Sequence, residues 1–139
     1  MKVSIVYWSG TGNTQAMAEA VAEGAKSAGA DVNLLTVSQA DISAADSDVL
    51  IMGCPAMGAE ELEESEFEPF FSGLESKLTG KKIGLFGSYD WGDGEWMRNW
   101  QDRVSADGGI LIAAGVTANN APDEIVLAEC KKLGESAAK

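Results

Sequence analysis

The chain has 139 residues, a mass of 14.5 kDa, a net charge of -12 and an isoelectric point near 4.2. This length fits one domain of about 100 to 200 residues. The excess of carboxylates argues against partners that require positive charge on the protein, such as nucleic acid and anionic membrane surfaces. The absence of histidine removes the commonest general base and the commonest metal ligand.

We expect one domain over residues 1–139 and a cytoplasmic location. Strand-like residues begin at Lys2 and Val3, which leaves no room for a secretory signal, and no apolar run reaches about 18 residues, the length of a membrane span. Cys54 and Cys130 fit neither a metal-ligand spacing nor a disulfide framework. We expect both to be buried structural thiols.

Five apolar runs of strand length divide the sequence, with helical periodicity between them. The runs are continuous, which is typical of parallel strands covered on both faces. This alternation predicts an α/β fold: a parallel sheet with right-handed crossovers and helices on both faces. The predicted strands are 3–7, 32–37, 49–54, 82–87 and 109–114.

The first helix should run from about Asn13 to Ala28 and stop at Gly29. The segment 38–48 carries only Ile42 as a large apolar side chain, so we expect a short or poorly formed helix there. Three later helices are predicted by apolar residues at helical spacing. These are Phe67, Phe70, Phe71, Leu74 and Leu78, then Trp96, Met97, Trp100 and Val104, then Val126, Cys130, Leu133 and Ala137.

The first strand runs into the sequence YWSGTGNT at positions 7 to 14. Gly10 and Gly12 can adopt positive φ and bring backbone N–H groups together at the start of a helix, where the helix dipole favours a phosphate. An ordinary capped turn is the alternative, but four side-chain donors exceed what a cap needs. The stretch lacks the lysine of a P-loop and the third glycine of a dinucleotide fingerprint. The donors are Ser9, Thr11, Asn13 and Thr14.

The loops after the third and fourth strands each offer a flat or polarizable side chain between small residues. Met57 precedes Gly58 in GCPAMGAEELEESEFEPF, and Trp91 lies between Asp90 and Gly92 in FGSYDWGDGEWM. Facing each other, Met57 and Trp91 would sandwich a planar ring system. Core packing is the alternative, although neither residue lies on an apolar stripe. With the first loop, the two loops predict a phosphorylated planar ligand.

These motifs, together with NNAPDE near the C-terminus, resemble the short-chain flavodoxins, particularly those of anaerobic clostridia and their relatives. The resemblance covers nearly the whole chain. It implies a flavodoxin-like, doubly wound five-stranded sheet of order 2-1-3-4-5 that binds one FMN non-covalently. It also implies an electron-transfer protein and not an enzyme with a catalytic substrate site.

The resemblance implies roles for single residues as well. Residues 9–14 would hold the phosphate, Met57 and Trp91 would cover the two ring faces, Glu60 would accept the flavin N3–H, and Gly58 would address N5. Pro55 stands where relatives often have serine, so a side-chain donor is lost. The full expected FMN-binding set is Ser9, Gly10, Thr11, Gly12, Asn13, Thr14, Pro55, Ala56, Met57, Gly58, Glu60, Ser88, Tyr89, Asp90, Trp91, Gly92 and Asn119.

The function implied is a low-potential one-electron carrier that cycles between semiquinone and hydroquinone and replaces a ferredoxin. Six glutamates within positions 60–68, with Asp90, Asp93 and Glu95, would destabilise an anionic hydroquinone and attract redox partners with basic docking faces. A solvated helix start explains the glutamates too, and both interpretations can hold. Asp90 replaces a glycine that is common in relatives. It would add a carboxylate near the flavin edge, and positive φ there would cost an aspartate more than a glycine.

Two other functions stay open from the sequence. One is an FMN-dependent reductase acting on a small quinone or dye, although Trp91 should block the substrate face of the flavin. The other is a flavin storage or regulatory module without redox duty. We expect a monomer with neither nucleic acid nor membrane partners.

Overall fold

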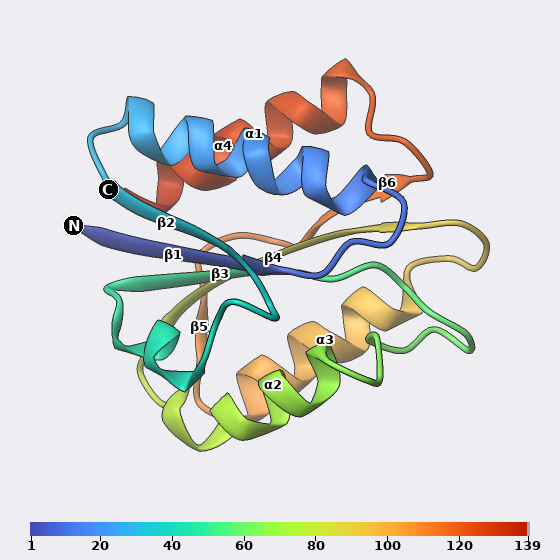
Figure 1. Ribbon diagram of the computed structural model, residues 1–139, viewed down its shortest axis with the longest axis horizontal. Coiled ribbons are helices and arrows are strands. Elements are labelled where there is room, and N and C mark those ends of the chain that lie inside the picture. Colours follow the sequence, from blue (N-terminus) through green and yellow to red (C-terminus); the bar gives the residue numbers. More distant parts are fainter. Residues whose placement is uncertain (139) are drawn as a thin grey trace.

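The computed structural model describes residues 1–138 as a parallel sheet between two layers of helices (Figure 1). Helices α1 (Asn13–Ser27) and α4 (Glu124–Ala137) cover one face, and α2 (Phe67–Leu74) and α3 (Glu95–Ala106) cover the other. Lys139, the last residue of the expected domain, lies outside the described residues. The predicted α/β architecture is confirmed.

The sheet contains β1 (Lys2–Tyr7), β2 (Asp31–Thr36), β3 (Val49–Gly53), β4 (Lys82–Tyr89), β5 (Ile110–Leu111) and β6 (Val116–Asn119). Its order is β2-β1-β3-β4-β5, as predicted, and every strand pair is parallel. Segment 38–48 forms a short 3-10 helix, η1 (Ile42–Asp46), which confirms the expectation of a short helix. Helix α2 is shorter than its apolar stripe and continues as a 3-10 turn, η2 (Glu75–Lys77).

The predicted fifth strand, 109–114, is wrong in its extent. β5 pairs with Lys82 and Ile83 of β4, and β6 pairs with the later segment 86–89. The Ile112 N–H still donates to Ile83 O of β4 at 2.9 Å, but residues 113–115 leave the ladder, and the Gly115 N–H donates to Gln101 Oε1 at 2.9 Å instead of to a strand. The split carries β6 to the carboxyl end of β4, where Asn119 pairs with Tyr89.

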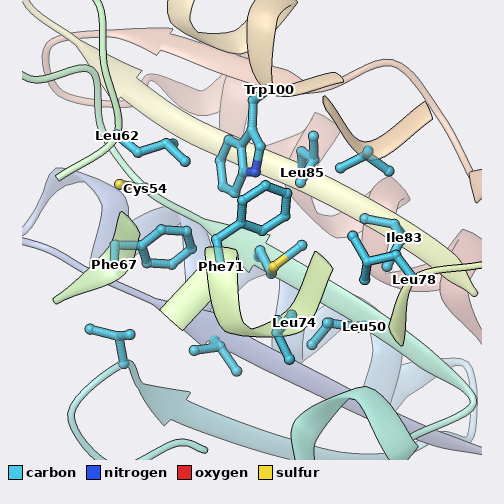
Figure 2. Packing of buried hydrophobic residues seen from close by; sticks show 14 of the residues in the cluster. Leu50, Cys54, Leu62, Phe67, Phe71, Leu74, Leu78, Ile83, Leu85 and Trp100 are labelled. Carbon is cyan, nitrogen blue, oxygen red and sulfur yellow. The ribbon is translucent and has the colours of Figure 1, made fainter. Parts of the chain in front are cut away.

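Two hydrophobic cores lie on the two faces of the sheet. In the core beneath α2 and α3, Trp100 meets the rings of Phe67 and Phe71 edge to face, with centroids 5.4 and 6.0 Å apart (Figure 2). Cys54 lies in this core and Cys130 in the other, so both predicted buried thiols are confirmed. Burial raises the pKa of Cys130 to about 12 and raises that of Cys54 further still.

Helices α1 and α4 pack closely because glycines stand at their contact. A Cβ atom on Gly134 would lie 2.0 Å from the carbonyl oxygen of Val21, and one on Gly24 would lie 2.0 Å from that of Lys131. Neither carbonyl belongs to a flexible side chain that could move away. The approach of the two backbones therefore excludes any larger residue at these positions.

Gly134→Ala should destabilise the protein by about 1 to 3 kcal/mol, because the added methyl group forces the two helices apart. The matched control is Gly73→Ala in α2. Its Cβ would meet only Ile42 Cγ2, at 3.7 Å, and the site is exposed, so the gain in helix propensity should stabilise by up to about 1 kcal/mol. Urea denaturation measures both variants, and the same sign of change in both would contradict this account.

Candidate functional site

The loops that follow β1, β3, β4 and β6 meet at one edge of the sheet, on the right in Figure 1. They enclose a cavity of about 240 Å³. A groove of about 460 Å³ beside η1 is larger, but it lies at the amino end of β1, whereas ligands of open parallel sheets bind at the carboxyl ends. Predicted residues lining the smaller cavity are Gly10, Thr11, Asn13, Pro55, Ala56, Met57, Ser88, Tyr89 and Asp90.

In the loop after β1, two backbone N–H groups donate to the same side-chain oxygen, that of Ser9. Gly12, with φ 95°, is the N-cap of α1 and supplies no side-chain cap. The Oγ of Ser9 accepts the N–H groups of Gly12 at 3.1 Å and Gln15 at 3.3 Å instead. An acceptor oxygen is thus held at the start of a helix whose dipole favours negative charge. Ser9 therefore caps the start of α1 in place of Gly12.

Thr14 differs from the other residues of this loop. Its side chain is buried, and its Oγ1 lies 3.0 Å from the Oγ of Ser88, which is also buried. The hydroxyl of Thr14 is therefore bonded to the end of β4 and not presented to solvent with those of Ser9 and Thr11.

The loop after β3 offers no free amide for a phosphate in its first residues. Pro55 has no N–H, the Ala56 N–H donates to Ser88 O at 3.0 Å, and the Met57 N–H donates to Glu61 O at 2.8 Å. The backbone of residues 55–57 therefore has no free N–H for a phosphate. Gly58 turns this segment with φ 51°, and a second backbone bond, from Glu61 N–H to Met57 O, closes the turn.

Met57 and Trp91 are both exposed at this edge of the sheet, with 39% and 66% of their surfaces accessible. Core packing is therefore the wrong interpretation for both. Met57 lines the cavity, and Trp91 lies on the neighbouring loop outside its lining.

Glu60 links the loops after β3 and β4. It adopts a left-handed backbone, φ 60°, and its Oε2 accepts the Trp96 N–H at 2.9 Å in the first turn of α3. A Cβ atom on Gly92, which has φ 95°, would lie 1.7 Å from Glu60 Oε1, so a larger residue there would have to displace this carboxylate. One oxygen of Glu60 is thus occupied within the protein, and Oε1 is left for the expected flavin N3–H.

Glu63, one of the six glutamates predicted to form an acidic surface, is buried instead. Its Oε1 accepts the N–H groups of Glu66 and Phe67 at 2.8 and 2.9 Å, and its Oε2 accepts that of Ser65 at 2.8 Å. Burial opposes ionisation, but these bonds and one from the Ser65 hydroxyl outweigh it and lower the pKa of Glu63 to about 2. Glu63 therefore fixes the start of α2.

The segment after β6 holds the loop that contains Asp90. Asn119 does not line the cavity; its Nδ2 donates to the carbonyl oxygen of Asp90 at 3.3 Å. Asn120 does line it, with φ 60° and its N–H donating to Tyr89 O at 2.7 Å. Asp90 itself does not adopt positive φ, so the backbone cost considered for aspartate here does not arise.

Sequence reasoning missed Asn120 and Trp8 as lining residues. Trp8 is part of the YWSGTGNT motif and follows β1 directly, which was a usable signal. Across residues 1–138 there is no group of three or more acidic or cysteine side chains arranged to hold a metal ion. Over the same residues, no helix is long and apolar enough to span a membrane.

Comparison with known proteins gives concordant matches. A family model described as Flavodoxin matches residues 5–134. The flavodoxin of Megasphaera elsdenii is 52% identical over 138 residues, covering 99% of this chain and 98% of that protein. The flavodoxin of Clostridium beijerinckii is 47% identical over 137 residues, covering 98% and 99%.

Solved structures agree with these matches. The solution structure of two-electron reduced Megasphaera elsdenii flavodoxin has a TM-score of 0.90 and covers 98% of both chains. A flavodoxin from the domain Archaea, 26% identical, has a TM-score of 0.88 and covers 99% of this chain and 96% of that chain.

Glu63→Gln should lower the free energy of unfolding at pH 7 by about 2 to 3 kcal/mol, since the neutral amide cannot accept the same set of N–H groups. The folded pKa of Glu63 lies below its unfolded value, so its contribution is complete above about pH 5 and is lost as pH falls toward about 2. The difference between parent and variant should shrink over that window.

Denaturation of both proteins between pH 7 and pH 3 measures this difference. The exposed neighbour Glu64, changed to Gln, is the control and should leave stability nearly unchanged. A difference for Glu63→Gln that stays constant with pH would refute the role of its carboxylate.

Proposed function

Since this chain belongs to the flavodoxin family, whose members bind FMN and carry electrons to redox partner proteins, we propose that it is a low-potential one-electron carrier. It cycles FMN between the semiquinone and the hydroquinone and donates electrons to larger redox enzymes in place of a ferredoxin. It acts as a cytoplasmic monomer in which residues 1–139 form one FMN-binding domain.

The observation that carries this proposal is the convergence of three specialised loops on one cavity. The first loop holds an acceptor oxygen with the N–H groups of Gly12 and Gln15, and the other two expose Met57 and Trp91. FMN supplies the electron chemistry when bound. In this proposal residues 9–14 hold its phosphate, Met57 and Trp91 cover its ring, and Glu60 Oε1 accepts its N3–H.

The charges around the cavity support a low potential. Glu61, Glu64, Asp90, Asp93 and Glu95 are exposed on the two loops beside it. Their field disfavours the addition of negative charge at the site, and about 1.4 kcal/mol of such destabilisation lowers a one-electron potential by roughly 59 mV. The same charges attract a partner with a basic face.

Anaerobic titration of the purified protein with dithionite tests the proposal. A yellow protein should pass through a blue neutral semiquinone before it reaches a low-potential hydroquinone. A protein that is colourless and cannot be reconstituted with FMN, or one that turns over NAD(P)H steadily on its own, would contradict it.

Asp90→Gly should raise the second reduction potential by about 20 to 60 mV, because it removes a carboxylate from the cavity lining. Asp90→Asn separates charge from backbone effects and should give a similar rise. Glu129→Gln, which removes one exposed charge from α4, is the distant control. Redox titration measures all three, and unchanged potentials and FMN affinity in both Asp90 variants would reject a role for this carboxylate.

A further inference from the structure

Thr14 and Ser88 form a buried pair of hydroxyl groups between the first loop and β4. Their oxygens are 3.0 Å apart, although the residues are 74 positions apart in the sequence, and their exposed fractions are 1% and 6%. Thr14 is the second residue of α1, at the end that receives the phosphate in the proposed function, and Ser88 lines the cavity. The pair thus connects the proposed phosphate site to the fourth strand.

The direction of this hydrogen bond decides what Thr14 can do next. Each hydroxyl has one hydrogen, and either oxygen can be the donor. If Thr14 donates to Ser88, its hydrogen is used up. If Ser88 donates to Thr14, the hydrogen of Thr14 is free for another acceptor. A phosphate dianion only accepts hydrogen bonds, so its presence selects the second direction, and a chain of aligned hydroxyls strengthens each bond in it.

Ser88 is the fixed member of the pair. Its carbonyl oxygen accepts the Ala56 N–H at 3.0 Å, and the residue is paired with Ala118 in the ladder between β4 and β6. These contacts hold its hydroxyl at a set position beside α1. Thr14 has no other side-chain hydrogen bond among residues 1–138.

We infer that Ser88 is a positioning residue: it donates to Thr14, orients the Thr14 hydroxyl toward the FMN phosphate, and so makes the site prefer phosphorylated over unphosphorylated flavin. This inference rests on the proposed function. Ser88 acts on the phosphate through Thr14, in addition to its place in the cavity lining. A bond that only ties α1 to β4 would stabilise the fold without distinguishing one flavin from another.

Quenching of flavin fluorescence by the apoprotein, titrated separately with FMN and riboflavin, separates these two roles. Ser88→Ala should weaken FMN binding by up to about tenfold, because the Thr14 hydroxyl that bonds the phosphate is no longer held in place, and leave riboflavin binding within about twofold. Thr14→Val, which keeps the shape and removes the hydroxyl, should lose at least as much FMN affinity. The double variant should lose no more than Thr14→Val alone, because the two side chains act in series.

The chain offers a matched control in Ser4 and Ser47, a second buried hydroxyl pair, located at the amino end of β1 away from the cavity. Ser4→Ala breaks that pair and should reduce stability without altering the ratio of FMN to riboflavin affinity. If Ser88→Ala is too unstable to titrate, Ser88→Cys, with a weaker donor of similar size, must still reduce the ratio.

Titration of the parent protein with the same flavins distinguishes a failure of the proposed function from a failure of the inference about Ser88. A parent that does not bind FMN overturns the proposed function. A parent that binds FMN, with Ser88 variants that keep its preference for FMN or lose both flavins equally, overturns this inference and leaves the function standing.

Discussion

The parallel direction of every strand is the constraint on which the site depends. Because no strand reverses, β1, β3, β4 and β6 all end at the same edge, and residues separated by 74 positions come within hydrogen-bond distance there. The helices that return the chain cover both faces of the sheet, so this edge is where the loops are free to vary. Because β5 and β6 are separate strands, β6 pairs with β4 as far as Tyr89. This pairing places Asn120, the next residue, in the cavity lining.

Polar contacts within the protein hold these loops in place. Trp96 is central to them: its Nε1 donates to Cys54 O at 3.0 Å, and its backbone N–H donates to Glu60. Cys54 Sγ in turn accepts the Glu63 N–H at 3.3 Å, and Glu63 caps α2. The loop after β3 is therefore attached to both helices beneath it, which reduces the ordering that a ligand must bring about.

The sequence predicts the parts of this arrangement that depend on local chemistry. The strand order followed from the family resemblance, and the positive φ at Gly12 and the position of Met57 outside the core followed from residue type and spacing. The contacts made between distant segments could not be found in this way. The pairing of Thr14 with Ser88 depends on how α1 sits against β4. Glu63 shows a different limit: its partners, the N–H groups of Ser65, Glu66 and Phe67, are close in sequence, but its residue type does not distinguish it from the neighbouring glutamates that stay at the surface.

The composition does not show which of the acidic side chains are paired with a positive charge. Arg103 lies 4.7 Å from the centre of the Phe71 ring and binds both Glu68 and Glu75, so its charge offsets part of the negative charge over the α2–α3 core. Asp93 is paired with Arg98, but both side chains are exposed and the pair contributes little to stability.

Among residues 1–138, Glu61, Glu64 and Asp90 have no ion-pair partner. Asp90 lines the cavity, where its charge would weaken the attraction of the first loop for the phosphate of the proposed function. Since that loop contains no lysine or arginine, the proposed affinity for a phosphate would have to come from the neutral donors of residues 9–14.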